Sequence, residues 1–270
     1  MAGTSVDELP EECLSNIISF TSPQDACRSA IVSAAFCDAS NEDDVWESFL
    51  PSDYREILSR LVFPVEFSSK KDLFRRLSST PLLIDGGKMT FLIDKRTNKK
   101  CYMLSARELS IAWSRNSLYW SWKSVSGSRF TQVVELRMVC WLEIYGKINI
   151  ENLSPHTTYG VYLVIQLTER AFGLDVVPSE ALIQTECCKS RGTICLSCDE
   201  RKKRGIDTLK EGEKGDRVVC VREDEWLEVE LGEFYNSGNL KELKMWFREI
   251  KGVHLKGGLL VEGIELRPKD

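Results

Sequence analysis

This 270-residue chain has little histidine, no basic excess and no long apolar run. With only His156 and His254 present, histidine-based acid–base catalysis has very few candidates. The net charge of -5 argues against a general nucleic-acid binder, because such domains carry a basic excess that neutralises phosphates. No stretch approaches the roughly 18 consecutive apolar residues of a membrane helix, and the acidic start MAGTSVDELPEE is unlike a secretory signal. These absences predict a globular protein of the cytoplasm.

Cysteine, in contrast, is plentiful, with ten in the chain. In a reducing compartment cysteines are thiols or metal ligands, and we expect mostly free, buried thiols. The stretch CCKSRGTICLSC raises the alternative of a zinc knuckle, but the usual paired spacing of zinc ligands occurs only once in it. We therefore expect no metal and no other cofactor at its four cysteines, Cys187, Cys188, Cys195 and Cys198. The basic run DERKKRG that follows is either a solvated loop or an import signal, which adds the nucleus as an expected location.

The first fifty residues have the apolar period of helices. Pro10 fits a first helical position, and helix starts follow at the Ser-Pro-x-Asp of residues 22–25 and the Asn-x-x-Asp of residues 41–44. One apolar face of the first helix holds Leu14, Ile17 and Ile18. Three helices this short bury little surface, so the unit is expected to need a partner or a neighbouring domain.

A helical connector over 51–85 leads to a region with a different period, and the Gly-Gly-Lys of residues 86–88 marks the boundary. In VVELRMVCWLEIYGKI the even-numbered residues 134–144 are apolar and alternate with odd-numbered ones that include Trp141, Glu143 and Tyr145, as in a half-buried strand. The same reading applies to YGVYLVIQLT, EWLEVELGEF, LKMWFREI and GLLVEGIELRP. Residues 86–270 are therefore predicted to form an antiparallel, jelly-roll-like β-sandwich, which makes the whole chain a small helical unit followed by an all-β domain.

The N-terminal stretch LPEECLSNIISFTSPQDACRSAIVSAAF resembles an F-box, over about residues 1–50. The Leu-Pro pair, the Ser-Pro-x-Asp turn and a later Val-Ser pair match that family, whereas Ala26 and Cys27 stand where leucines are usual. The resemblance implies docking to a Skp-type adaptor within a cullin-based ligase by six apolar residues, and we expect the five of them between residues 9 and 18 to be exposed in the isolated chain. The six residues are Leu9, Pro10, Leu14, Ile17, Ile18 and Val32. The alternative is an unrelated three-helix cap on the next domain.

The C-terminal region resembles the phloem protein 2 family, whose best-known type is the Nictaba-like lectin. The stretches ARELSIAWSRNSLYWSWK, VVELRMVCWLEIYGKI, TYGVYLVIQLT, EWLEVELGEFYN and GIELRP match it in order. The resemblance implies binding of N-acetylglucosamine oligomers and related N-glycan cores by two tryptophans and two carboxylates. In this chain it points to Trp113, Trp120, Glu242 and Glu249.

Strand parity gives a second interpretation of these four residues. Trp113 shares its parity with Leu109 and Ile111, which suggests the core face, and Trp120 shares its parity with Trp122. Glu242 and Glu249 have opposite parity, so they could meet one ligand only across a bulge or a strand end. Sugar contact and core packing both stay open for the tryptophans.

Together the two resemblances suggest a non-catalytic substrate receptor of an SCF-type ubiquitin ligase. Its F-box would hold the adaptor, and its lectin-like domain would select a glycoprotein. One alternative keeps the adaptor role but lets the sandwich bind a protein surface directly, with a vestigial sugar site. The other is a glycoside hydrolase that uses two carboxylates. No nucleic acid or membrane is expected as a partner.

Overall fold

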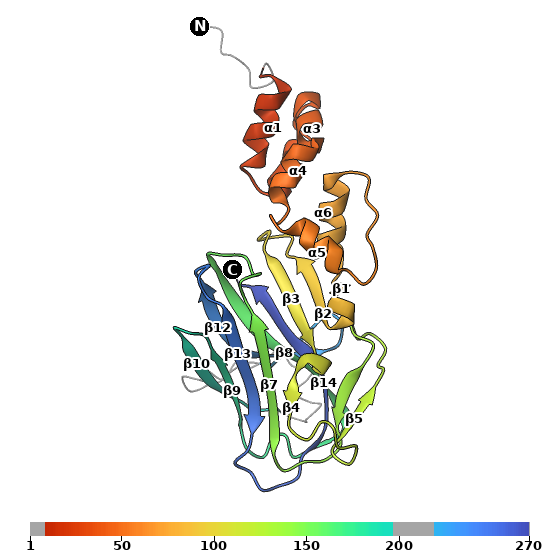
Figure 1. The fold of residues 1–270 in the computed structure, drawn as a ribbon, viewed down its shortest axis with the longest axis vertical. Helices are drawn as coiled ribbons and strands as arrows, with labels where there is room; N and C mark the ends of the chain where they lie inside the picture. The colour runs from red at the N-terminus through yellow and green to blue at the C-terminus, as the bar shows by residue number, and fades with distance from the viewer. Residues whose placement is uncertain (1–8, 197–218, 270) are drawn as a thin grey trace. The chain divides into compact units, whose positions relative to one another are not determined.

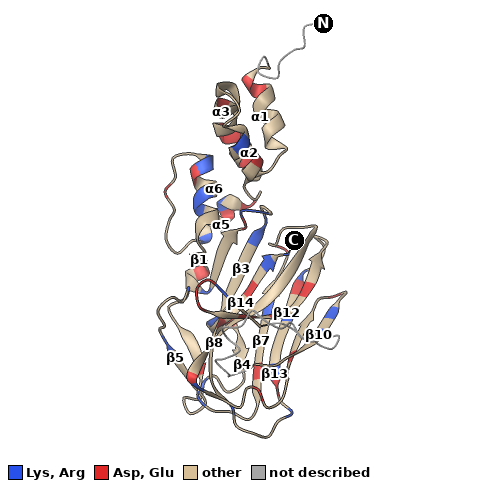
Figure 2. Cartoon of the chain, turned by 180° about the vertical axis from the view of Figure 1, so that it is seen from behind, with Lys and Arg blue, Asp and Glu red and all other residues tan. Residues whose placement is uncertain are grey.

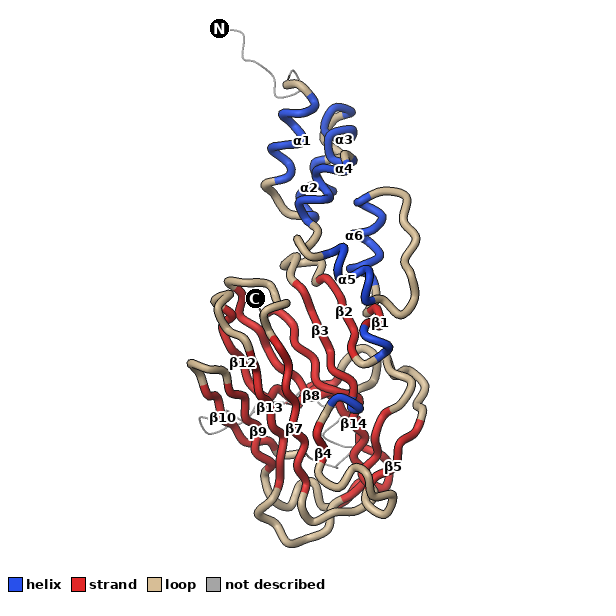
Figure 3. The backbone as a smooth tube through the Cα atoms, in the orientation of Figure 1, coloured by secondary structure: helices blue, strands red, loops and turns tan. Residues whose placement is uncertain are grey.

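The computed structural model describes residues 9–196 and 219–269. Its contacts divide the chain into an N-terminal unit, Met1–Gly86 with Phe91–Cys101, and a C-terminal unit, Gly87–Thr90 with Tyr102–Asp270. Figure 1 traces the chain through both units, and Figure 3 shows that helices make up most of the first and strands most of the second. Cys198 and the basic run of residues 199–205 lie outside the described residues.

The N-terminal unit is built from short helices. They are α1 (Glu11–Ser19), α2 (Pro23–Ser29), α3 (Ala34–Asn41), α4 (Asp43–Phe49), α5 (Tyr54–Arg60) and α6 (Lys70–Ser79). The predicted start at residue 22 is confirmed, because the Ser22 side chain accepts a hydrogen bond from the backbone N–H of Asp25 at 3.1 Å. The start at Asn41 is wrong. Ser33 caps an unpredicted helix that runs to Asn41, so residues 11–49 hold four helices instead of three.

The helices of this unit share one apolar core. Leu14 and Ile18 of α1 are buried, and α1 packs against α3 and α4. The Trp46 indole N–H donates to the carbonyl of Ser40 at 2.8 Å, and its ring lies 5.4 Å from that of Phe74 on α6. Because Trp46 joins α4 to α6, the connector helices belong to the same packed unit as the first four.

Two short strands, β1 (Leu82–Ile84) and β2 (Met89–Ile93), follow the helices along the chain, with the short 3-10 turn η2 (Asp85–Gly87) between them. The larger sheet of the C-terminal unit has the strand order β3-β14-β8-β12-β11, and β14 also pairs with β6, which pairs with β5. Its strands are β3 (Lys100–Ser105), β5 (Trp120–Lys123), β6 (Val133–Leu136), β8 (Thr157–Phe172), β11 (Val219–Val221), β12 (Leu227–Asn236) and β14 (Gly257–Pro268). The 3-10 turn η3 (Ala106–Glu108) follows β3.

The second sheet has the order β10-β9-β13-β7-β4. Its strands are β4 (Ser110–Ile111), β7 (Leu142–Asn149), β9 (Ser179–Gln184), β10 (Lys189–Ile194) and β13 (Glu242–Glu249). The pairings in both sheets are antiparallel, and fully buried side chains such as Phe247 and Ile264 fill the space between them. The antiparallel sandwich is therefore the predicted fold.

The long alternating stretch from residue 133 to 149 is two strands rather than the single predicted one. β6 ends at Leu136 and β7 begins at Leu142, and the two strands lie in different sheets. Between them the backbone N–H groups of Arg137 and Met138 both donate to the Tyr119 carbonyl. Met138 is 45% exposed despite its apolar parity, because here the chain crosses from one sheet to the other.

The outer face of the larger sheet carries both acidic and basic side chains, which form ion pairs with one another. Arg222 lies 3.1 Å from Glu228, and Arg267 lies 2.6 Å from the other Glu228 oxygen. Burial raises the pKa of Glu228, but the hydrogen bond from Arg267 and the nearby positive charges outweigh it and hold that pKa below its usual value. Figure 2 shows Lys and Arg interspersed with Asp and Glu along these strands, a pattern of a solvated surface rather than of a phosphate-binding one.

The cysteines do not occupy the core as predicted. Of the nine cysteines in residues 9–196 and 219–269, Cys101 alone is buried. The others lie on helix surfaces, loops and outer strand positions, where a small side chain faces water at little cost. The same part of the chain holds no group of three or more potential metal ligands and no helix long and apolar enough to cross a bilayer.

Candidate functional site

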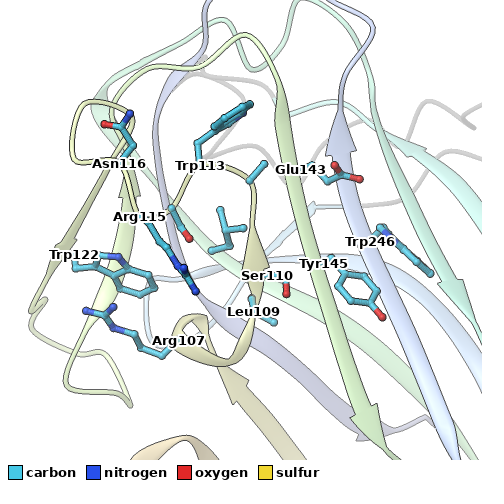
Figure 4. A pocket seen from close by; sticks show the side chains of 13 residues that line it. Arg107, Leu109, Ser110, Trp113, Arg115, Asn116, Trp122, Glu143, Tyr145 and Trp246 are labelled. Carbon is cyan, nitrogen blue, oxygen red and sulfur yellow. The ribbon is translucent and has the colours of Figure 1, made fainter.

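A cavity of about 1190 Å³ lies beside β4 and the turn that follows it. Four aromatic side chains line it, and Figure 4 shows Trp122 with Arg107 at one side and Tyr145 with Trp246 at the other. Trp113 lies between these two sides. The charged side chains of the wall are Arg107, Arg115 and Glu143. Flat rings combined with few charges suit a ligand that has both apolar faces and hydroxyl groups.

Trp113 is the most exposed of the four aromatic side chains, at 61%. Strand β4 ends at Ile111, and the next turn is closed by hydrogen bonds from Ser114 to the Ile111 carbonyl and from Asn116 to the Trp113 carbonyl. Trp113 has φ 65°, in the left-handed region that bulky residues rarely adopt. Its parity with Ile111 therefore does not place it in the core, because the strand has already ended. A strained, exposed tryptophan at the rim of a cavity is typical of a functional position.

Trp120 lies under this turn instead of beside the cavity. Its side chain is 2% exposed, and its indole N–H donates to the Ala112 carbonyl at 2.9 Å. The bond satisfies the only polar atom of the ring and fixes the residue that precedes Trp113. The structure thus gives Trp120 no free face for a sugar; it is a positioning residue for Trp113.

Trp122, two residues further along β5, is half-buried in the cavity wall. The Arg107 guanidinium stacks on its ring at 3.6 Å and also donates to the Gln132 side-chain oxygen at 2.6 Å. This cation–π contact holds the ring on one side of the cavity.

Glu242 and Glu249 lie on opposite faces of β13. The strand pairs with β7 from one residue to the other in unbroken register, so no bulge brings them together. Glu242 points outward, where the hydrogen bond from Lys147 holds its pKa below the usual value. Glu249 points inward and is 4% exposed.

Glu249 belongs to a buried ion pair. It pairs with Lys256, which is 1% exposed, and it accepts hydrogen bonds from the backbone N–H groups of Gly252 at 2.7 Å and Lys251 at 3.1 Å. Burial raises the pKa of Glu249, but the hydrogen bonds and the Lys256 charge outweigh it and keep that pKa below its ordinary value. The pair ties β13 to the start of β14, and it leaves Glu249 unavailable to a ligand.

The carboxylate that does reach the cavity is Glu143 of β7. It accepts a hydrogen bond from the Trp141 indole at 3.2 Å, and the Arg248 guanidinium lies 3.9 Å away. Strand parity already placed Glu143, Tyr145 and Trp141 on the outward face, so the sequence held a signal for this residue that the search for two spaced glutamates missed.

On the N-terminal unit, large apolar side chains are exposed near the C-terminal end of α1 and after α2. Ile17 is 52% and Phe20 84% exposed, and Val32 follows Ile31, which is 87% exposed. Among the residues predicted to dock an adaptor, Pro10 is also exposed and Leu9 half-buried, whereas Leu14 and Ile18 are buried. The prediction that those two are exposed is wrong, because so small a unit uses them as its own core. Phe20 and Ile31 were not predicted.

Family comparisons identify both units. The model of the family described as Phloem protein 2 matches residues 99–268, and the one described as F-box-like matches residues 6–52. The chain is 44% identical to the F-box protein PP2-B15 of Arabidopsis thaliana, an alignment covering 97% of this chain and 96% of that one.

The chain belongs to the phloem protein 2 family. It is also 42% identical to the F-box protein VBF of Arabidopsis thaliana over 97% of this chain and 99% of that protein, and 41% identical to the F-box protein PP2-B13 of the same plant over 96% and 98%. In this phloem protein 2 domain, only Trp113 of the four residues predicted from the family lines the cavity. Glu143, Tyr145 and Trp246 line the same cavity and were not among the four.

Proposed function

We propose that this protein is a non-catalytic substrate receptor of an SCF-type ubiquitin ligase. Its F-box docks a Skp-type adaptor, and its phloem protein 2 domain binds glycans that contain N-acetylglucosamine. The observation that supports glycan binding is the exposed Trp113 ring, which a left-handed turn presents at a cavity that Glu143 also lines. Relatives with the same two domains are consistent with an adaptor subunit.

The chemistry of the cavity suits a pyranose. Such a ring has apolar C–H faces that stack on indole, and a rim of hydroxyls that donate to a carboxylate. One sugar face on one indole covers about half of the roughly 150 to 250 Å² of that side chain, which is on the order of 2 to 3 kcal/mol before ordering costs. After those costs we expect a dissociation constant of roughly 10 μM to 1 mM for one domain. Multivalent glycoproteins would then be held better than single chains.

The alternative of a glycoside hydrolase fits the cavity less well. Such enzymes generally place two carboxyl groups on either side of the scissile bond. Glu143 is the one carboxylate in the walls that the described residues form. Glu242 lies outside these walls, and Glu249 is buried in its ion pair with Lys256. A cavity with a single carboxylate suits binding without bond cleavage.

Two substitutions test the sugar half directly. Trp113→Ala should weaken binding of an N-acetylglucosamine trimer by about tenfold or more, because it removes a stacking face. Glu143→Gln should weaken it by a similar factor, because it removes a charge-assisted acceptor. Calorimetry of the full chain with the trimer gives both affinities.

Glu242→Gln is the matched control, since it removes a carboxylate from the same sheet face outside the cavity walls. It should bind as the unmodified chain does. Absence of any trimer binding by the unmodified chain at millimolar sugar would favour direct recognition of a protein surface. Equal weakening by Glu242→Gln and Glu143→Gln would place the site elsewhere.

A further inference from the structure

The outward side chains of the five-stranded sheet form straight rows across the strands. Register pairs Ser110 of β4 with Tyr145 of β7, Tyr145 with Trp246 of β13, Trp246 with Leu182 of β9, and Leu182 with Arg191 of β10. Paired residues in antiparallel strands point to the same face, so these five share one line. Four strand spacings of about 4.8 Å make the row about 19 Å long.

Tyr145 and Trp246 form the centre of this row and are not needed to fill the core. Their ring centroids lie 5.0 Å apart with a 42° tilt, and both side chains are half-buried. Their inward neighbours Ile144, Met245 and Phe247 already occupy the space between the sheets with no exposed surface. A tilted aromatic pair on the outside of a sheet leaves partly open ring faces, which offer a surface for stacking.

Polar rows flank the aromatic one. On one side Glu143 pairs in register with Arg248, whose guanidinium donates to Glu180 at 3.2 Å. On the other side Lys147 pairs in register with Lys244, and both contact Glu242. The Glu143 row lies on the cavity side of the ring pair, where it supplies an acceptor to the hydroxyl and acetamido groups of a stacked sugar, whereas the lysines and Glu242 lie outside the cavity walls and pair with one another.

The charged side chains beside the ring pair form ion pairs with one another. Glu242 pairs with Lys147 and Lys244, and Glu180 pairs with Arg248 and with Arg191 of β10. Charges that neutralise one another locally offer little free charge to a charged polymer, so this face suits an uncharged chain.

The Tyr145–Trp246 pair lines the same cavity as Trp113. Trp113, Glu143, Tyr145 and Trp246 line the same cavity, and Figure 4 shows the pair at the opposite side of it from Trp122. We propose that Tyr145 and Trp246 form a second stacking platform, so that the ligand is a linear, uncharged oligosaccharide lying across the strands. The inference rests on the proposed sugar-binding function and adds where the chain of sugars runs.

Length dependence tests this platform. In calorimetry of the full chain with N-acetylglucosamine dimer and tetramer, affinity should rise about tenfold or more with length. Trp246→Ala should bind the dimer within about twofold of the unmodified chain and lose most of the gain with length, while Trp246→Phe keeps part of it. Tyr235→Ala removes an aromatic ring that is 55% exposed outside the cavity, and it should behave as the unmodified chain. Thermal melts show that each variant is folded.

The outcomes separate this inference from the function on which it rests. If the unmodified chain binds neither oligomer, the sugar-binding proposal and the platform both fail. If it binds both with a length dependence that Trp246→Ala and Trp246→Phe leave intact, the platform alone is overturned. Equal losses for dimer and tetramer in Trp246→Ala would make the pair the primary site and also overturn a second platform. Tighter binding of a tetramer of galacturonate would contradict an uncharged ligand.

Discussion

Aspartate at both Ile17 and Phe20 should abolish co-purification of the chain with a Skp-type adaptor. Both side chains are large, apolar and more than half exposed on one short helix end, as residues awaiting a partner are. Anchors of this kind cost about 2 kcal/mol or more each when lost, and two of them together correspond to at least about a thousandfold in affinity. Buried, unpaired carboxylates in the complex would add to the loss.

The adaptor experiment needs a control for surface charge and a control for fold. Val253→Asp changes an exposed valine of the C-terminal unit and should leave co-purification unchanged. Circular dichroism of the double variant should retain the helical signal, because Leu14 and Ile18 still fill the core of the unit. Undiminished co-purification by a folded double variant would contradict docking through this surface.

Trp120→Ala should destabilise the phloem protein 2 domain by about 3 to 5 kcal/mol. The substitution empties a site whose side chain is 2% exposed and leaves the Ala112 carbonyl without its indole donor. Trp113→Ala should change the stability of the domain by less than about 1 kcal/mol, because an exposed ring contributes little to packing.

Chemical denaturation that follows the strand signal measures both variants, with the transitions of the two units analysed separately because the chain divides into two compact units. The contrast between the tryptophans is the informative result. Equal destabilisation by the two substitutions would indicate that Trp113 packs in the core, and it would contradict a stacking site at that turn.

Local chemistry made much of the fold predictable. The Ser-Pro-x-Asp pattern encodes a capped helix start without help from the rest of the chain, and α2 begins at Pro23 as expected. Alternation within one sheet is equally local, so the outward positions of β7 and β13 could be read before their partners were known. The helix that Ser33 caps was not predicted, because the Asn-x-x-Asp of residues 41–44 is a competing capping pattern close by in the sequence.

The candidate site was less predictable because its residues depend on where strands stop. The alternation of apolar and polar residues in the sequence continues past Leu136, although the chain passes there from one sheet to the other. A period of two residues is the same in both sheets, so it cannot reveal where the chain changes sheet. Likewise the parity of Trp113 was meaningless beyond Ile111, where a left-handed turn takes over. The placement of Glu242 and Glu249 on opposite faces followed from parity, yet the pairing of Glu249 with Lys256 depends on a return of the chain after β13.

A bridging experiment tests the account most directly. Resin carrying N-acetylglucosamine trimer is incubated with purified Skp-type adaptor, with and without the full chain. The account predicts that the resin retains adaptor only when the chain is present, and that soluble trimer releases it. Trp113→Ala should be retained on the resin far less than the unmodified chain while still co-purifying with the adaptor, and the Ile17 and Phe20 double variant should be retained without adaptor. Failure of the resin to retain adaptor, with a chain that binds adaptor in solution, would contradict a glycan-selecting receptor.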